Sequence, residues 1–221
     1  MDDINGVVNV LPKTLPSKSA HKGRIGNMKG MRALTEDEIN LVCKSFAGPT
    51  KYRDLALFEL GIRAGFRVSE MLSLRIKDVY QHGKIVDEVY VQRRNMKKKI
   101  EGRCAPLHEK AKEAIGAWVK ELLTSGGWYP DMMLFRSRVG SNKAISRVMA
   151  WKILTEAYQT NGLGMGIGCH GLRKSYARKV FKQLDYNLVD TQLAMGHKDI
   201  SSTIKYLASN NDKVKAAILA D

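Results

Sequence analysis

The sequence predicts an α+β fold that is mainly helical and carries a small antiparallel β-sheet. Apolar residues recur at helical spacing in several segments, one segment is instead rich in β-forming residues, and 221 residues suffice for one substantial core. Residues 1–32 contain prolines, glycines and six lysines or arginines without a sustained apolar period. We therefore expect a flexible basic N-terminal arm over residues 1–32 and one main domain over residues 33–221.

The first helix is expected at Thr35, because Thr35-Glu36-Asp37-Glu38 has the form of a capping box and apolar residues follow at helical spacing. Gly48-Pro49 ends this helix. A second helix from about Tyr52 is apolar on so many sides that it belongs in the core. A break at Gly65 ends the second helix.

Residues 83–107 show a different pattern. The β-formers Ile85, Val86, Val89, Tyr90 and Val91 are separated by a basic stretch from the segment 103–107, which predicts a small sheet or a long hairpin. Helical spacing then returns. We expect helices over about 111–122 and 146–158, further helices after Arg173, Leu188 and Ser202, and a tail helix over 212–220.

The charge of the chain predicts a polyanionic partner. Thirty-seven lysines and arginines against 22 acidic residues give a formal charge of +15, so nucleic acid is the first candidate and an anionic membrane surface the second. A protein that binds a membrane surface is expected to carry a basic amphipathic helix, and the sequence shows none. With no apolar run of about 18 residues and no signal segment, we expect a cytoplasmic protein. Three widely spaced cysteines suggest neither a disulfide framework nor a zinc site.

Three separated segments carry the residue types needed to break a phosphodiester. They are Ala-Gly-Phe-Arg-Val-Ser-Glu at 64–70, His-Gly-Leu-Arg at 170–173 and Gly-His-Lys-Asp-Ile-Ser-Ser-Thr-Ile-Lys-Tyr at 196–206. Transesterification needs a nucleophile, cationic donors for the phosphate oxygens and an acid for the leaving alcohol. Taken singly, each segment has a plainer explanation: a surface ion pair, a phosphate-binding helix start, or a tyrosine that only packs.

Together the three segments resemble the dispersed active site of the tyrosine recombinases, the phage integrase family, over roughly residues 33–210. The resemblance implies that Arg67 is the first catalytic arginine and that Glu70, three residues on and on the same helix face, supports it. The resemblance also implies that Arg173 is the second phosphate clamp, since an arginine fork can hold two phosphate oxygens, and that His170 is a proton shuttle or donor.

The spacing from Gly196-His197 to Tyr206 is the strongest single signature. In the resemblance His197 donates to the scissile phosphate, and Tyr206 attacks it to leave a 3′-phosphotyrosyl bond and a free 5′-hydroxyl. The run Ser201-Ser202-Thr203 is expected to cap a short helix that presents the tyrosine.

The general acid is expected on the β-hairpin. Family enzymes use a lysine there, and counting back from Pro106-Leu107 places it at Lys98, although a register slip of one would choose Lys97 or Lys99. Other basic residues near the site are expected to contact DNA, namely Lys97, Lys99, Arg93, Arg94 and Lys174. No metal site or cofactor is expected, since the histidines are scattered and no carboxylate pair of the two-metal type is present.

The resemblance also implies partners. The expected partner is double-stranded DNA, on which four protomers join two duplexes and exchange strands through a Holliday junction, with a monomer as the form expected away from DNA. Relatives usually carry a helical core-binding domain ahead of the catalytic one, whereas only the basic arm precedes Thr35 here. The chain is therefore either a minimal recombinase or a catalytic fragment. The tail helix either docks on a neighbouring protomer or packs on its own core.

Two other functions are compatible with parts of this pattern. The same constellation resembles the site of type IB topoisomerases, but the short chain and the His-to-Tyr spacing favour the integrase branch. The alternative from a different class is a DNA-binding regulator, or an accessory factor of a mobile element, that keeps this fold without cutting DNA. The complete set of candidate catalytic residues argues against a protein that only binds.

Overall fold

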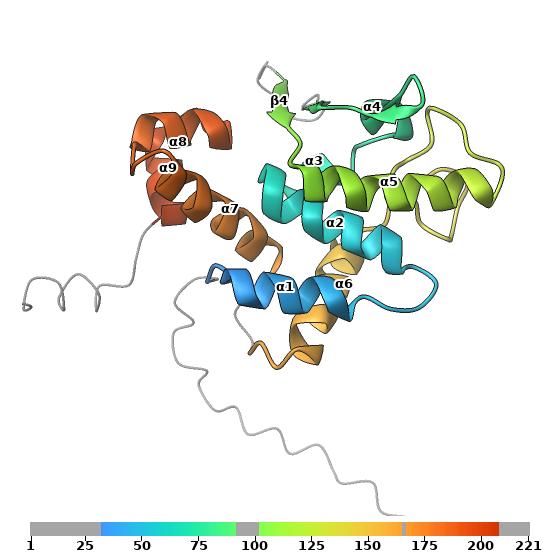
Figure 1. The fold of residues 1–221 in the computed structure, drawn as a ribbon, viewed down its shortest axis with the longest axis horizontal. Helices are drawn as coiled ribbons and strands as arrows, with labels where there is room; N and C mark the ends of the chain where they lie inside the picture. The colour runs from blue at the N-terminus through green and yellow to red at the C-terminus, as the bar shows by residue number, and fades with distance from the viewer. Residues whose placement is uncertain (1–31, 92–101, 165–166, 208–221) are drawn as a thin grey trace, which may run out of the picture.

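The computed structural model describes residues 32–91, 102–164 and 167–207 (Figure 1). In chain order its helices are α1 (Glu36–Ser45), α2 (Lys51–Ala64), α3 (Val68–Met71), α4 (Ile76–Val79), α5 (Glu109–Thr124), α6 (Arg147–Thr160), α7 (Cys169–Gln183), α8 (Leu188–Met195) and α9 (Ile200–Leu207). The strands are β1 (Tyr80–Gln81), β2 (Lys84–Ile85), β3 (Glu88–Val91) and β4 (Arg103–Pro106). The predicted class, mainly helical α+β, is confirmed.

Helix α2 is the central element of the fold. It packs against α5 and α7 and also contacts α1, α3 and α6 (Figure 1). Leu57 and Leu60 belong to one apolar cluster, Phe58 and Ile62 to another, and none of the four is more than 3% exposed. The prediction that this helix lies in the core is confirmed, and its burial fixes the position of the chain that leaves its C-terminal end.

Helix α1 begins as the sequence predicts. The Thr35 hydroxyl accepts from the backbone N–H of Glu38 at 3.3 Å, and the Glu38 carboxylate accepts from the backbone N–H of Thr35 at 2.9 Å. This reciprocal capping box satisfies two of the N–H groups that a helix start leaves without partners.

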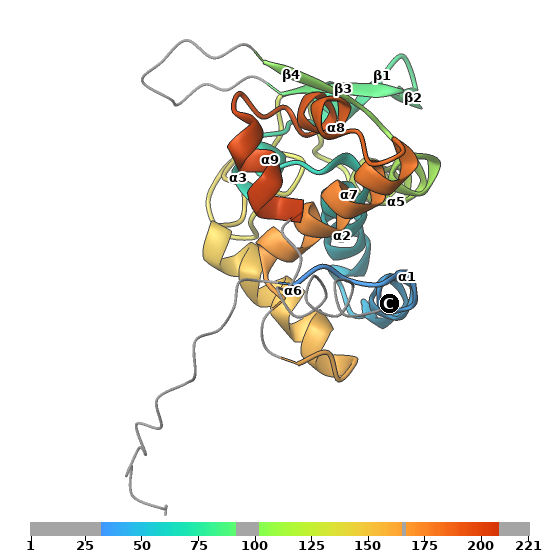
Figure 2. The same ribbon diagram turned by 90° about the vertical axis from the view of Figure 1, so that its left-hand side faces the viewer.

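The strands form two antiparallel pairs, β1 with β2 and β3 with β4, along the same edge of the molecule (Figure 2). In β3, Val89 and Val91 are buried while Tyr90 is exposed, the alternation expected of a strand with one face on the core. Val91 pairs with Arg103 at the end of β3 that leads towards the connection between the two strands. The predicted Lys97, Lys98, Lys99, Arg93 and Arg94 lie outside the described residues.

Helices α7, α8 and α9 pack on one another, and α7 also contacts α2 (Figure 2). Two boundaries differ from the prediction. Helix α7 begins at Cys169, so Arg173 lies inside the helix rather than before it. Helix α9 begins at Ile200, so Ser201-Ser202-Thr203 lie inside its first turn and the prediction that they cap it is wrong. The buried Thr203 hydroxyl instead lies 2.8 Å from Nδ1 of His197.

Candidate active site

Arg67 is held at the start of α3 by its own neighbour. Helix α2 ends at Gly65, whose left-handed backbone (φ 61°) turns the chain, and whose missing side chain leaves room for the Tyr176 ring. The Arg67 backbone N–H donates to one oxygen of Glu70 at 2.8 Å, and its guanidinium Nη1 donates to the other oxygen at 2.8 Å. The predicted partnership of Arg67 with Glu70 is therefore present.

The charge of Glu70 is stabilised in this arrangement. Burial of the carboxyl acts to raise the pKa of Glu70, but the backbone and side-chain hydrogen bonds from Arg67, with the nearby positive charge of Arg173, hold that pKa below its ordinary value. The carboxylate is thus ionised at neutral pH. By accepting one hydrogen bond from the backbone N–H and one from the guanidinium, it fixes both the backbone and the side chain of Arg67.

Arg173 is the most deeply placed cation of the site, with 1% of its surface exposed. Its Nη1 donates to the carbonyl oxygen of Gly65, and its Nη2 donates to the carbonyl oxygen of Met195 at 2.6 Å. These carbonyls lie at the C-terminal ends of α2 and α8, where the helix dipole is negative and favours a cation. The guanidinium therefore bridges two helix ends, while its buried Nε has no partner in the described part of the chain.

The pKa of Arg173 is lowered to about 10, because burial disfavours the charged form and the neighbouring guanidinium groups of Arg67 and Arg103 add like charge. Glu70 and Tyr206 act in the opposite direction. Arg173 remains protonated at neutral pH. It is a buried, oriented positive charge of the kind that stabilises negative charge developing in a transition state.

His197 lies between Arg173 and α9 and is 7% exposed. Its Nε2 is 2.9 Å from Arg173 Nη2, and its Nδ1 is 2.8 Å from the hydroxyl of Thr203. Because a guanidinium can only donate, Nε2 accepts, which assigns the ring proton to Nδ1 and makes Thr203 its acceptor. In this structure His197 orients Arg173 while Thr203 fixes the tautomer and the plane of the ring.

Tyr206 completes the cluster from α9. Its hydroxyl is 3.3 Å from Nδ1 of the exposed His170, and its ring lies 5.4 Å, centroid to centroid, from the ring of His197 at an interplanar angle of 30°. The guanidinium carbon of Arg173 is 5.6 Å from the Tyr206 ring centroid. The fold thus brings together five predicted catalytic residues from distant segments: Arg67, His170, Arg173, His197 and Tyr206. The predicted supporting residue Glu70 lies with them, bonded to Arg67.

Sequence reasoning missed two residues of this region. Arg103 on β4 donates to the carbonyl oxygens of Ala64 at 3.0 Å and Ala194 at 2.6 Å, and Thr203 holds His197. The sequence signal for Arg103 is weak, since it is one more charged residue after a basic stretch, at the start of a strand in which only Ala105 is buried. For Thr203 the sequence predicts a helix cap, a role that the start of α9 at Ile200 rules out.

The other predicted site residue within the described part of the chain is Lys174, which follows Arg173 on α7 and is half-buried. Burial, with the nearby charge of Arg178, lowers its pKa. Among the described residues no group of histidine, cysteine or acidic side chains is placed to hold a metal ion. The same residues contain no helix that is long and apolar enough to cross a membrane. All three cysteines are free thiols.

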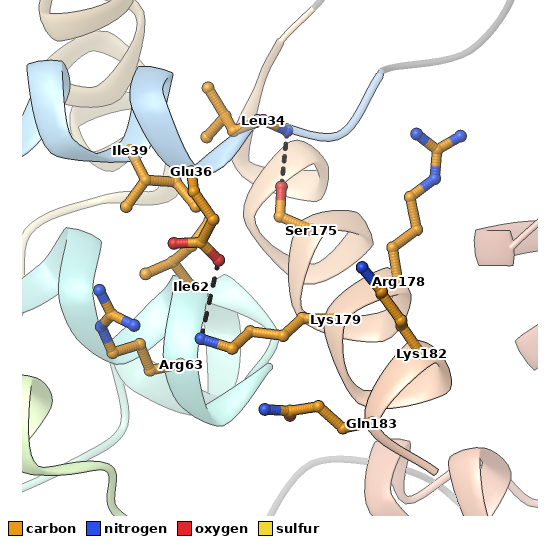
Figure 3. A pocket seen from close by; sticks show the side chains of 10 residues that line it. All are labelled: Leu34, Glu36, Ile39, Ile62, Arg63, Ser175, Arg178, Lys179, Lys182 and Gln183. Carbon is orange, nitrogen blue, oxygen red and sulfur yellow. Dashed lines mark hydrogen bonds and ion pairs between the residues drawn. The ribbon is translucent and has the colours of Figure 1, made fainter. Parts of the chain in front are cut away.

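A hollow of about 490 Å³ lies elsewhere, between α1, α2 and α7 (Figure 3). Leu34, Ile39 and Ile62 contribute its apolar lining, and basic side chains of α7 contribute its rim. A hydrogen bond of 2.7 Å from the Leu34 backbone N–H to the Ser175 hydroxyl joins the chain before α1 to α7. None of the residues lining this hollow belongs to the Tyr206 cluster, so it is separate from the candidate active site.

Comparison with curated proteins defines the class. Residues 32–213 match the family model described as the phage integrase family. The chain is 32% identical over 165 residues to the probable integrase/recombinase YoeC of Bacillus subtilis (strain 168), covering 75% of this chain and 82% of YoeC. It is 29% identical over 185 residues to the type 1 fimbriae regulatory protein FimE of Escherichia coli (strain K12), covering 83% and 88%. Tyrosine recombinase XerC of Vibrio atlanticus (strain LGP32) is 32% identical over 161 residues, covering 72% and 47%.

Solved structures agree in fold. XerA recombinase superposes with a TM-score of 0.68 at 19% identity, covering 87% of this chain and 64% of that one. XerH bound to its difH substrate gives 0.64 at 19% identity, covering 85% and 53%. The chain thus spans about half to two thirds of these longer recombinases. The class is that of the tyrosine site-specific recombinases. The chain belongs to the phage integrase family.

Proposed function

We propose that this protein cleaves and rejoins double-stranded DNA at specific sites through a covalent bond between Tyr206 and a 3′-phosphate, with no metal and no ATP. The observation that carries the proposal is the placement of the Tyr206 hydroxyl 3.3 Å from His170, with Arg173 and His197 against the face of its ring. A tyrosine that served only packing would not need two histidines and a buried arginine around it.

The chemistry assigned to these residues balances without a co-reactant. The Tyr206 oxygen attacks phosphorus, its proton passes to Nδ1 of His170, and the bond from phosphorus to the 5′-oxygen breaks. Arg67 and Arg173 hold the non-bridging oxygens. The departing 5′-oxygen takes a proton from a general acid, for which we propose Lys98. The reverse attack by a 5′-hydroxyl releases Tyr206, and because the phosphotyrosyl bond retains the energy of the broken one, religation needs no ATP.

We place His197 beside the second arginine in this reaction. Its Nε2 accepts from Arg173 and its tilted ring lies 5.4 Å from that of Tyr206, so it positions both the clamp and the nucleophile. The donation to the scissile phosphate that the family implies would use the same Nε2, once that atom carries a proton and Arg173 bonds to phosphate instead.

The assembly that we propose is a homo-tetramer on two duplexes, with strand exchange through a Holliday junction and a monomer away from DNA. The formal charge of +15 supports a DNA partner. Several longer structural neighbours are described as bound to DNA, including XerH and the Tn1549 transposon integrase. We further propose that the basic arm, residues 1–32, lies along DNA phosphates, and that the tail, residues 212–220, docks on a neighbouring protomer.

The test is a suicide DNA substrate, nicked near the scissile phosphate and built from sequences flanking the protein's own gene. We expect a denaturation-resistant covalent complex that is absent for Tyr206→Phe, since the phenyl ring keeps the packing but lacks the attacking oxygen. Tyr186→Phe is the matched control, because Tyr186 is a 65% exposed tyrosine outside the cluster. Adduct formation by this control should equal that of the wild type.

Two results would count against the proposal. An adduct that persists in Tyr206→Phe would assign the nucleophile to another residue. Salt-sensitive DNA binding with no adduct from the wild type would favour the alternative, a regulator or accessory factor that binds without cutting.

A further inference from the structure

Arg103 on β4 reaches two helix ends with one side chain. Its Nη2 donates to the carbonyl oxygens of Ala64 at 3.0 Å and Ala194 at 2.6 Å, and its Nη1 lies 3.3 Å from the carbonyl oxygen of Gly65. Ala64 is the last residue of α2 and Gly65 is its C-cap, while Ala194 lies in the last turn of α8. The planar fork of an arginine can serve acceptors on two elements at once, which a lysine ammonium on one flexible stem does less well.

The rest of the Arg103 side chain touches the residues directly before two candidate catalytic residues. Its guanidinium carbon is 5.2 Å from the ring centroid of Phe66, which precedes Arg67. Its stem passes Gly196, which precedes His197; a Cβ on that glycine would lie 2.7 Å from Cδ of Arg103. Any displacement of Arg103 would therefore act on the backbone immediately next to both functional side chains.

Arg103 and Arg173 bridge the same pair of helix ends. Both donate to the Gly65 carbonyl oxygen, and on α8 they bond to the adjacent carbonyls of Ala194 and Met195. Two like charges this close are unfavourable unless other groups compensate, and the carbonyl groups supply that compensation. A second guanidinium would let the helix ends stay joined while the first one engages a phosphate.

We infer that Arg103 is a positioning residue, which keeps the ends of α2 and α8 joined so that Arg67 and His197 stay aligned on the scissile phosphate. The inference rests on the function proposed above. It differs from a direct role in DNA binding, in which Arg103 would contribute to affinity for the phosphate backbone.

The test compares Arg103→Met and Arg103→Lys with Arg75→Met. Arg75 is a matched control because its guanidinium is also partly exposed but pairs with Asp131, next to α4. Single-turnover cleavage is measured at saturating suicide substrate, and the dissociation constant is measured with each substitution in a Tyr206→Phe background. We expect both Arg103 variants to cleave about 10- to 100-fold more slowly, the range for a displacement of about 1 Å, with affinity nearly unchanged.

A loss confined to the dissociation constant would overturn the inference in favour of a phosphate contact. Full cleavage by Arg103→Lys would also overturn it, because charge alone would then suffice. An equal loss of cleavage rate in Arg75→Met would overturn it as well, because the loss of any partly exposed arginine would then have the same effect.

Amide hydrogen exchange of the protein alone provides a second readout that needs no cleavage. We expect faster exchange in peptides covering residues 64–67 and 194–197 for the Arg103 variants and not for Arg75→Met. Unchanged exchange there would contradict the inference whatever the cleavage rate. Wild-type protein that forms no adduct would count against the proposed function, while the exchange data would still decide on Arg103. If Arg103→Met does not fold, Arg103→Lys allows the same comparison.

Discussion

The candidate active site has a buried half and an accessible half, and the two are held differently. Arg173 and His197, the buried half, are 1% and 7% exposed and are bonded to helix-end carbonyls, to each other and to Thr203. In the accessible half, Arg67 has a side chain that is 32% exposed, His170 is exposed, and Tyr206 meets His170 at 3.3 Å. The proposed phosphate clamp is oriented in advance, whereas the hydroxyl of the proposed nucleophile has one longer hydrogen-bond contact among the described residues.

This difference follows from the cost of burying a charge. A guanidinium taken out of water needs its donors satisfied, and the C-terminal ends of α2 and α8 supply oxygens that carry partial negative charge. A tyrosine hydroxyl and an exposed imidazole keep access to water and need no such framework. We therefore expect substitutions in the buried half to disturb both folding and catalysis, and substitutions in the accessible half to disturb mainly catalysis.

The largest effect within this comparison is expected for Arg173→Lys. A lysine retains the charge but cannot bridge Gly65 and Met195 while also donating to His197. We expect single-turnover cleavage to fall about 100- to 1,000-fold, as for loss of a transition-state donor, with a lower urea midpoint. Arg178→Lys, an exposed arginine on the same helix, is the control. Equal cleavage rates for Arg173→Lys and Arg178→Lys would contradict the idea that the buried half depends on an oriented guanidinium.

A smaller effect is expected for Thr203→Val. The valine removes the hydroxyl that accepts from His197 Nδ1, and the loss of this buried hydrogen bond costs about 1–3 kcal/mol in the free energy of unfolding. Since His197 also orients Arg173, we expect cleavage to slow by about tenfold, which corresponds to about 1.4 kcal/mol. Thr203→Ser keeps the hydroxyl and should stay close to wild type in urea melts and in cleavage. Loss of function in Thr203→Ser would show that packing of the methyl group matters instead.

The smallest effect on stability is expected for Glu70→Gln, next to the accessible Arg67. The pKa of Glu70 is held below its ordinary value of 4.5, so its ionisation stabilises the fold above that pH, and this contribution disappears as the pH falls through the lowered pKa. We expect the variant to be less stable by about 0.5–1.5 kcal/mol at neutral pH. The difference from wild type should shrink in acid. A difference that is the same at pH 3 and pH 7 would mean that the charge of Glu70 is not responsible.

Features of the fold that depend on neighbouring residues could be predicted from the sequence. The capping box at Thr35 and Glu38, the buried helix that ends at Gly65, and the contact of Arg67 with Glu70 all involve partners three or four residues apart or one periodic segment. For these, spacing alone specifies which groups meet.

The remaining parts of the site depend on backbone carbonyls, which every residue carries and which no sequence pattern marks. That Gly65 and Met195 would accept from Arg173, or that Arg103 would join the same helix ends, follows only from how α2, α7 and α8 pack. Thr203 shows the same limit. Its neighbours suggested a helix cap, but tertiary packing placed its hydroxyl against His197.

The bridged helix ends also have a consequence for folding. Arg173 is 108 residues from Gly65, and Arg103 is 91 residues from Ala194, so the site can form only when most of the chain has reached its final topology. Contacts of such high sequence separation are entropically costly and slow the folding of a chain. Under the proposed mechanism, a partly folded chain would carry Tyr206 without the oriented arginines, and it would not cut a DNA strand that it lacks the structure to rejoin.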